Sequence, residues 1–450
     1  MSTQPSPPKN RVLGTVFLTV FLDIVGFSIL FPLFPAILQH YVELSGEGGW
    51  LWDLRTWLRE ITGGNEFAVV AFFGGMLGAL YSLLQFLFAP IWGGLSDRIG
   101  RRPTMLVTLS GTLAGYVLWI FAGSFWILIL SRLVNGVMAG NISTASAVIA
   151  DTTDSKSRVR GMAMVGMAIG LGFVMGPAIG GMLSLVELQP GIPDGLWPAG
   201  FALNQFSLVA AAAALLAALN LFMAFTRLGE TLPPEKRGLH KREGAWNPLG
   251  QILQQGLPGV ARITFISFLY TTAFGAMEFC LTFLAVDRFD FTPKDCMWIF
   301  VFVGLMIAFV QGGFVRRMAP KIGERRMLIA GLVLILPGNA LIALAGSPLM
   351  LYAGLFFMAT GSAMAMPCMS SLASLYAPAD RQGLILGQFR SAGSLARAIG
   401  PFLGGFLYLV LGNASPYWGG ALGLFLPLWL CFALPQPRAS EVELEPAKLP

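Results

Sequence analysis

The sequence predicts an all-α integral membrane protein in which twelve transmembrane helices form two pseudo-symmetric six-helix bundles. Of its 450 residues, 55% are hydrophobic and 12% are charged, whereas about 25% of an average soluble domain is charged. The hydrophobic residues gather in twelve stretches, each close to the roughly 20 residues that a helix needs to cross a bilayer. A pattern of small residues in the first half of the chain recurs in the second. These observations exclude an ordinary soluble fold.

The twelve stretches use up most of the chain and leave little for a separate soluble domain. They begin near Val12, Phe67, Pro103, Phe125, Val159, Phe201, Ala261, Met297, Met327, Pro348, Gly383 and Pro416. No small-residue cleavage site follows the first stretch, so we expect an uncleaved first helix rather than a signal peptide.

Lys and Arg residues indicate the orientation of the chain. The formal net charge is +6, and most basic residues lie at the termini or in even-numbered connections, for example Arg98, Lys156 and Arg316. The positive-inside rule then places both termini in the cytoplasm. Because topology accounts for the positive charge, we expect no nucleic-acid partner. We expect a monomeric, multi-pass protein of a bacterial inner membrane.

A polar connection and an internal repeat divide the chain. We expect an N-terminal bundle over residues 1–227, a cytoplasmic linker over 228–260, a C-terminal bundle over 261–436 and a cytoplasmic tail over 437–450. The run Gly176, Pro177, Gly180 and Gly181 of the fifth span recurs as Gly400, Pro401, Gly404 and Gly405 in the eleventh, at a constant offset (400 − 176 = 224). The offset is close to half the chain length, which favours duplication over chance.

The first external connection, about Gln39 to Glu66, is longer than a simple turn. Its hydrophobic residues recur at helical spacing opposite charged residues, and they are Trp50, Leu51, Leu54, Trp57 and Leu58. This pattern predicts a short helix that lies on the outer membrane face, where it either anchors the protein or acts as a gate.

The strongest motif is a charged turn between the second and third spans, which reads Gly93-Gly94-Leu95-Ser96-Asp97-Arg98-Ile99-Gly100-Arg101-Arg102. Asp97 would accept hydrogen bonds from a neighbouring helix N-terminus while the arginines pair with carboxylates. Such a latch would break and re-form as the two halves rock. A positive-inside loop explains the arginines but neither Asp97 nor the glycines. The form G-x-x-x-D-R-x-G-R-R resembles the cytoplasmic signature of the major facilitator superfamily.

Two further motifs extend the resemblance. Arg132-Leu133-Val134-Asn135-Gly136 in the fourth span is similar to the superfamily's intramembrane arginine motif. The run from Gly172 to Gly181, with Gly176, Pro177 and Gly180, is similar to the motif of its proton-coupled antiporters and implies export. Because glycines permit close packing and proline removes a backbone hydrogen bond, the fifth span is either a bending element that controls leak or an ordinary packing helix.

Asp23 lies inside the first span, ahead of Pro32 and Pro35. An ionised carboxylate at the centre of a membrane helix costs about 2.5 to 3.5 kcal/mol. Protonation removes that cost, so Asp23 is a candidate proton carrier. The alternative is a buried salt bridge between Asp23 and Arg132 that only locks the fold.

The first half also resembles the tetracycline-resistance branch of the drug:proton antiporters. The resemblance rests on Asp23, Tyr81-Ser82-Leu83-Leu84-Gln85 and Ala150-Asp151-Thr152-Thr153, and is dense over residues 18–183. It implies that Asp23, Gln85 and Arg132 lie on the substrate and proton path. Three residues typical of the branch are missing from this chain. Gly115 takes the place of the branch's aspartate in the third span, and Ile307 lies near the position of the branch's histidine in the eighth. The branch's aspartate in the ninth span has no counterpart here. Tetracycline is therefore not implied as the substrate.

The second half offers other intramembrane charges. Glu278 lies in the seventh span, in its outer half, and is either a second proton station, a partner for a cationic substrate group or a residue paired permanently with an arginine. Arg390 and Arg397 share one face of the eleventh span. Arg390 is close enough to the cytoplasm to snorkel, whereas Arg397 lies near mid-membrane and needs a carboxylate or an anionic substrate. Further candidates to line a cavity are Asn135, Asn141, Tyr270, Phe274 and Gln311.

We expect no metal, no cofactor and no enzyme activity. The four cysteines are scattered singly, the histidines His40 and His240 fall in predicted loops, and no ATP-binding loop of the G-x-x-x-x-G-K type occurs. The sequence thus predicts a proton-coupled antiporter that exports amphipathic organic molecules by alternating access. The alternatives are a uniporter or importer of a metabolite, lipid or organic anion, and a non-transporting receptor or scaffold.

Overall fold

The computed structural model describes residues 9–44, 50–61, 66–153, 155–186, 200–237, 257–378 and 382–435. These residues are helical apart from turns, short connections and an isolated bridge between Ala122 and Phe201. Residues 238–256 of the expected linker, with His240, and the expected tail 437–450 lie outside the described ranges.

The first half of the chain consists of helices that follow the expected spans. They are α1 (Lys9–Ser28), η1 (Phe31–Leu33), α2 (Phe34–Leu44), α3 (Trp50–Ile61), α4 (Glu66–Ile99), α5 (Arg101–Ile120), α6 (Phe125–Met138), α7 (Asn141–Thr152), α8 (Ser155–Leu183), α9 (Ser207–Arg227) and the short η2 (Pro234–Lys236).

The second half repeats this organisation. Its helices are α11 (Pro258–Phe289), α12 (Pro293–Phe309), the π-helical η3 (Val310–Val315), α13 (Arg316–Ile322), α14 (Glu324–Ala343), α15 (Pro348–Tyr376), α16 (Gln382–Leu411) and α17 (Ser415–Phe432).

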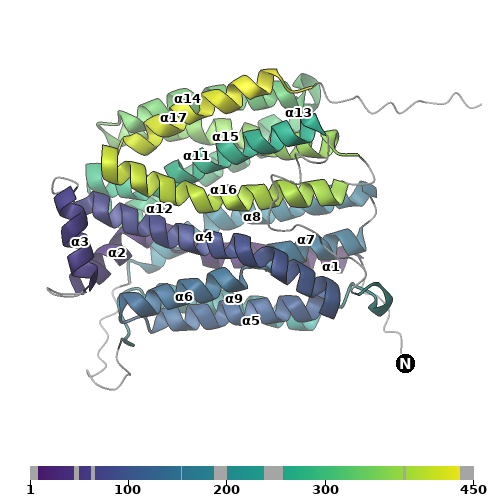
Figure 1. Cartoon of the computed structure of the whole chain (residues 1–450), viewed down its shortest axis with the longest axis horizontal. Helices are drawn as coiled ribbons and strands as arrows, with labels where there is room; N and C mark the ends of the chain where they lie inside the picture. Colours follow the sequence, from purple (N-terminus) through teal and green to yellow (C-terminus); the bar gives the residue numbers. More distant parts are fainter. Residues whose placement is uncertain are drawn as a thin grey trace, which may run out of the picture.

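The long helices follow the expected spans closely. In the described part of the chain, eleven helical stretches are long and apolar enough to cross a membrane. The 18-residue α17 packs against α11 and α14 and completes the second bundle. Figure 1 shows the long helices side by side, with α14 and α17 at one edge, α5, α6 and α9 at the other, and α4, α8 and α16 between them. The predicted all-helical fold in two bundles is confirmed.

Three expected spans are interrupted, and one begins later than predicted. The eighth passes from α12 through the π-helical η3 to α13. Pro32 and Pro35 cannot donate backbone hydrogen bonds, and the first span changes there from α1 through η1 to α2. The fourth span divides into α6 and α7 near Gly140. The sixth begins at Ser207 rather than near Phe201, because the Asn204 side chain accepts the backbone N–H of Phe206 and holds a turn before the helix.

Each half has its own hydrophobic core. The second half has a large cluster that includes Tyr270, Leu332 and Leu355, and a small one around Val260 and Ile385. The first half has two clusters, one around Tyr41 and Trp119 that also reaches Phe283 of α11, and one around Val16 and Met105. The two halves are thus separate packing units that touch along a shared face.

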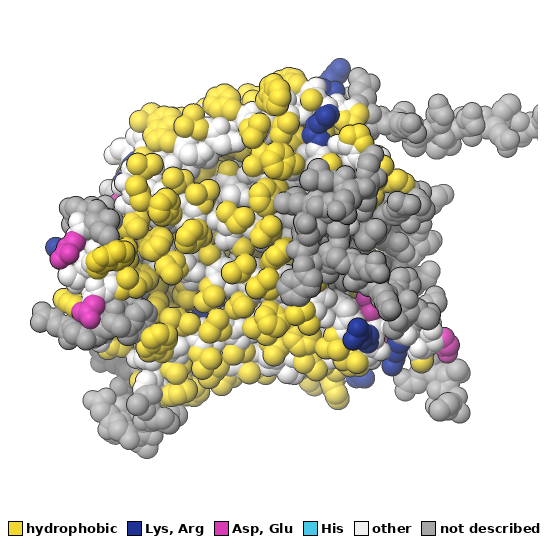
Figure 2. All heavy atoms as spheres, viewed as in Figure 1, with side chains coloured by type: hydrophobic (Ala, Val, Ile, Leu, Met, Phe, Trp, Pro, Cys, Tyr) yellow, Lys and Arg dark blue, Asp and Glu magenta, His cyan; other side chains and the backbone are white. Residues whose placement is uncertain are grey.

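The outer faces of the bundle are apolar. Leu215 and Phe222 of α9 are 71% and 65% exposed, and Leu422 of α17 is 69% exposed. Figure 2 shows hydrophobic side chains over the middle of one face, with charged side chains towards its two ends. This surface suits hydrocarbon in the middle and water at the ends.

The predicted external helix is present as α3. Leu58 is buried against the first-half core, Trp57 is exposed, and the guanidinium of Arg55 lies 4.9 Å from the ring centroid of Trp52. Whether α3 anchors or gates stays a prediction.

Candidate functional site

The two halves pack most closely at the end of the molecule that carries α3, which we call the α3 end. A β-carbon on Gly75 of α4 would lie 2.6 Å from the carbonyl oxygen of Pro401 in α16. A β-carbon on Gly181 of α8 would lie 2.4 Å from Cβ of Met297 in α12. Neither distance leaves room for a side chain, so glycine permits these close approaches.

The opposite end carries the charged turn of α4 and α5, and we call it the Asp97 end. Here α16 is loosely surrounded: a β-carbon on Gly387 would meet no atom within 4 Å, and one on Gly393 would meet only the Arg397 side chain at 3.8 Å. Along α16 the halves are therefore tightly packed at the α3 end and leave open space towards the Asp97 end.

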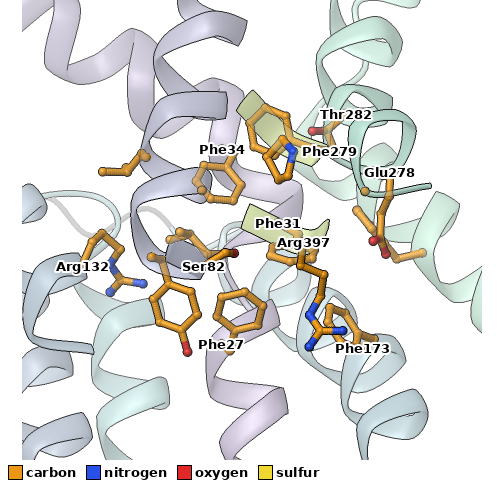
Figure 3. A pocket seen from close by; sticks show the side chains of 17 residues that line it. Phe27, Phe31, Phe34, Ser82, Arg132, Phe173, Glu278, Phe279, Thr282 and Arg397 are labelled. Carbon is orange, nitrogen blue, oxygen red and sulfur yellow. The ribbon is translucent and has the colours of Figure 1, made fainter. Parts of the chain in front are cut away.

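A cavity of about 80 Å³ lies between the halves, at the middle of the bundle. Its wall is mainly apolar, and Figure 3 shows aromatic rings from both halves around it. The aromatic lining residues are Phe27, Phe31, Phe34, Tyr81, Phe173, Phe279 and Phe300. Its polar lining residues are Ser82, Arg132, Glu278, Thr282 and Arg397. The cavity thus combines an apolar body with two guanidinium groups and one carboxylate.

Arg132 is held by aromatic rings. Its guanidinium lies 4.8 Å from the ring centroid of Trp119 and 5.8 Å from that of Tyr116, and Nη2 donates to Ser131 Oγ at 3.0 Å. Within the described part of the chain, no carboxylate oxygen lies within 4.0 Å of it. The alternative of an Asp23–Arg132 salt bridge is therefore not realised here. Cation–π contacts take its place.

Glu278 and Arg397 face the same cavity without forming an ion pair. Arg397 donates from Nη2 to Ser394 Oγ at 3.0 Å, and among the described residues Glu278 has no salt bridge within 4.0 Å. Their charges still interact over the longer distance. The Arg397 side chain is exposed to open space although it lies deep between the halves, and Figure 3 shows its guanidinium beside Phe173. Within the described ranges, Glu278 is thus not paired with an arginine.

Asp23 belongs to a separate polar chain within the first half. Asn141 of α7 donates from Nδ2 to Asp23 Oδ1 at 2.9 Å, and Thr108 of α5 donates to Asn141 Oδ1 at 2.5 Å. Asp23 does not line the cavity, whereas Tyr81 of α4 does. The structure therefore joins the predicted residues Asp23 and Asn141 and places them behind the cavity wall.

Asn135 fills the space left by Gly115. The Asn135 side chain is 3% exposed, and a β-carbon on Gly115 would lie 1.9 Å from its Oδ1. Neither amide atom of Asn135 has a hydrogen-bond partner among the described residues. The missing aspartate of the third span is thus replaced by a glycine notch and a neutral amide from α6.

The other predicted substrate residues do not line the cavity. Gln85 is half-buried on α4, Tyr270 is buried and stacks on Phe274 at a centroid distance of 5.8 Å, and Gln311 lies in η3. Arg390 lies nearer the Asp97 end and donates to Ser146 of α7. Their roles in substrate binding stay predictions.

The charged turn forms an ion-pair network. Arg101 contacts Asp97 at 2.5 Å and Asp151 of α7 at 2.8 Å. The backbone N–H groups of Arg101 and Arg102, at the N-terminus of α5, donate to the Glu230 carboxylate at 3.0 and 3.3 Å. Arg102 also donates to the Phe225 carbonyl, whereas Arg98 is exposed and Gly93 is buried. The expected pairing of arginine with carboxylates is present.

The glycines of the fifth span pack α8 against α1. β-Carbons on Gly172, Gly176 and Gly180 would collide with Ile24, Ser28 and Ile29 of the first span, and Pro177 is buried beside them. These contacts give the motif a packing role, and the bending role stays a prediction.

Sequence reasoning missed the residues whose roles depend on tertiary contacts. Phe279, Thr282 and Phe300 line the cavity, and Glu230 caps α5, yet none carries a local signal that separates it from a lipid-facing or loop residue. Glu230 did carry one hint. It is an acidic residue that follows directly after a predicted span, and a basic turn lies earlier in the same half.

Comparisons with known proteins identify the family of this chain. The sequence profile of the Major Facilitator Superfamily matches residues 16–322 and 314–449. The human protein "Major facilitator superfamily domain-containing protein 10" is 34% identical over 457 residues, which cover 96% of this chain and 94% of that protein. The class C tetracycline resistance protein of Escherichia coli is 27% identical over 413 residues, which cover 92% of both.

Two solved structures show the same fold. The crystal structure of the human organic anion transporter MFSD10 (TETRAN) superposes with a TM-score of 0.74 at 30% identity. The match covers 95% of this chain and 100% of that chain. The D-xylose-proton symporter superposes with a TM-score of 0.72 at 14% identity, covering 95% and 98%. The chain therefore belongs to the Major Facilitator Superfamily and is a multi-pass membrane transporter rather than an enzyme.

Proposed function

We propose that this transporter is a proton-coupled antiporter that exports amphipathic organic molecules bearing a negative charge. The observation that carries the proposal is the lining of the central cavity, where aromatic rings surround two guanidinium groups and one carboxylate. Rings bury the apolar body of such a molecule, and a guanidinium binds its anionic group. The human relative titled an organic anion transporter supports the same substrate class.

The cavity must widen to hold such a substrate. Pockets for organic ligands measure about 300 to 1,000 Å³, whereas this one measures about 80 Å³. The close glycine contacts at the α3 end and the open space beside Gly387 give the halves one tight and one loose end. Rocking between two such packings is the alternating-access motion of transporters built from repeats.

Proton coupling is assigned to Asp23 and Glu278. A neutral carboxyl enters a dry interface at far lower cost than a charged one, so protonation of either residue changes which packing of the halves is favoured. Arg132 lines the same cavity as Tyr81 and lies against the rings of Trp119 and Tyr116. Tetracycline itself is not proposed as the substrate, because Gly115 replaces the branch's carboxylate.

The shared cavity of Glu278 and Arg397 favours a second candidate, proton-coupled import of an organic anion. When Glu278 is protonated, its neutral carboxyl no longer competes with the anion for the Arg397 guanidinium. The proton and the anion then bind together and cross the membrane in the same direction. This coupling has the opposite sign to antiport, so one flux experiment separates the two.

The experiment uses the full chain in proteoliposomes with 1-pyrenesulfonate, an aromatic anion, as the probe. Antiport predicts uptake into vesicles whose lumen is more acidic than the medium, and symport predicts uptake when the medium is more acidic. Equal uptake under both gradients indicates a uniporter, and no uptake beyond protein-free vesicles indicates a receptor or scaffold. Glu278→Gln and Asp23→Asn should each reduce gradient-driven uptake, whereas Glu235→Gln, at an exposed position, should not. Proton coupling through these residues is wrong if both substitutions leave the uptake unchanged.

We further propose that the Asp97 end and both termini face the cytoplasm. The two bundles span residues 1–227 and 261–436, and a single chain is sufficient for transport. The basic residues around Arg98 and Arg316 support this orientation. A cysteine at exposed position 98 (Arg98→Cys) should react with a membrane-impermeant maleimide in inside-out vesicles and not in right-side-out ones. The kind of membrane stays a prediction, since the relatives include human and bacterial proteins.

A further inference from the structure

Arg390 lies on the same face of α16 as Arg397. The two positions are seven residues apart, which corresponds to almost two turns and about 10.5 Å along the helix axis. Arg397 faces the central cavity, and Arg390 lies nearer the Asp97 end. The two guanidinium charges repel each other.

Among the described residues, no carboxylate compensates the Arg390 charge. Its Nη1 donates to Ser146 Oγ of α7 at 2.7 Å, and Ser146 directs its own hydroxyl hydrogen to the Ile142 carbonyl at 2.8 Å. No carboxylate oxygen of a described residue lies within 4.0 Å, and Nε and Nη2 make no hydrogen bond to a described residue. A half-buried guanidinium therefore keeps two nitrogens for another acceptor, and adjacent N–H groups suit a bidentate oxyanion.

The space in front of Arg390 is open. Gly387 and Gly393 lie three residues before and after it, and neither position is filled by a neighbouring element. Further along the same helix, β-carbons on Gly400 and Gly404 would lie 2.9 and 2.7 Å from carbonyl oxygens of α11. Arg390 thus stands where α16 leaves close packing and borders accessible space between the halves.

The Arg390–Ser146 bond also crosses between the halves. Among hydrogen bonds that join two described residues, it alone links the first half to the second. Arg390 accordingly lies on the boundary that the substrate must pass between the Asp97 end and the cavity.

We propose that Arg390 is a second oxyanion-binding station, which holds the carboxylate, sulfonate or sulfate group of the transported molecule before the group reaches Arg397. This inference rests on the proposed transport of amphipathic anions and adds a site outside the central cavity. The rival reading is that Arg390 only clamps the halves through Ser146. The two readings differ in what Ser146 contributes: a clamp needs its hydroxyl, and a station needs only the guanidinium.

The test compares Arg390→Gln, Arg390→Lys and Ser146→Ala in the full-length transporter, with Arg317→Gln as an exposed control near the same end. Initial rates of 1-pyrenesulfonate transport from the Asp97 side give KM and kcat. Arg390→Gln should raise KM about tenfold, as expected for the loss of a charged hydrogen bond, with kcat largely retained. Arg390→Lys should restore part of the affinity, and Ser146→Ala and Arg317→Gln should leave KM unchanged.

The station is overturned if Arg390→Gln leaves KM unchanged, or if Ser146→Ala raises KM as much as Arg390→Gln. Failure of the wild type to transport the probe under any gradient refutes the proposed function instead. In that case fluorescence titration of the purified proteins with 1-pyrenesulfonate still decides the station: weaker binding in Arg390→Gln but not in Ser146→Ala supports it, and equal binding in all three overturns it.

Discussion

Removing the Glu230 carboxylate should destabilise the first half measurably. Its Oε1 accepts the backbone N–H groups of Arg101, Thr231 and Leu232 at 3.0, 3.0 and 2.9 Å, and its Oε2 accepts that of Arg102 at 3.3 Å. A capping side chain contributes about 0.5 to 2 kcal/mol, and a negative charge at a helix N-terminus adds about 0.3 to 1 kcal/mol. The ion pair with Arg237 at 3.8 Å is partly exposed and adds little. Glu230→Ala should therefore cost about 2 kcal/mol.

The measurement is thermal unfolding of the purified transporter, followed by the fluorescence of its 11 tryptophans. For a folding unit of about 150 to 250 residues, a loss of 2 kcal/mol lowers Tm by about 4 to 8 °C. Glu230→Gln keeps an acceptor and loses the charge, so its Tm should fall by less. Glu235→Ala removes an exposed glutamate of the same segment and is the matched control. Equal melting of Glu230→Ala and Glu235→Ala would refute the capping argument.

Three further substitutions test other contacts. Gly100→Ala should cost more than about 1 kcal/mol, because Gly100 has φ +110° and its β-carbon would lie 2.3 Å from Glu230 Oε2; a Tm equal to wild type would contradict this. Gly75→Ala should reduce transport, because the added methyl group pushes α4 away from α16. Gly94→Ala on the same helix is the control and should transport normally, because its β-carbon would meet no atom within 4 Å. Equal flux in both variants would disprove the close contact. Tyr41→Phe removes the buried hydroxyl that donates to the Ala122 carbonyl and accepts from Asn204, and should lower stability by about 1 kcal/mol; thermal unfolding without a shift would count against it.

The spans, the charged turn and α3 were predictable because their signals are local. Hydrophobic length reports a membrane helix wherever it packs, and the turn at Asp97 keeps its charges within ten residues of sequence. The break in the first span likewise follows from Pro32 and Pro35 alone. These features do not depend on which helices become neighbours.

The partners of the charged residues were not predictable in the same way. Asp23 and Arg132 are the obvious opposite charges of the first half, yet Asp23 binds Asn141 and Arg132 lies over Trp119. The contact between Arg390 and Ser146 joins positions 244 residues apart. Such pairings depend on helix rotation and register, which an apolar helix that is hydrophobic on all sides does not encode in its periodicity.

The notch at Gly115 also constrains how the sequence can change. Because a β-carbon there would lie 1.9 Å from Asn135 Oδ1, an acidic residue at position 115 and an asparagine at position 135 exclude each other. A mutational path from this chain to a third-span carboxylate must therefore first shorten the side chain at 135 and only then replace Gly115. The reverse order passes through an overpacked intermediate that loses about 1 to 3 kcal/mol. The two positions thus behave as one epistatic unit, in which the order of substitutions decides which variants remain folded.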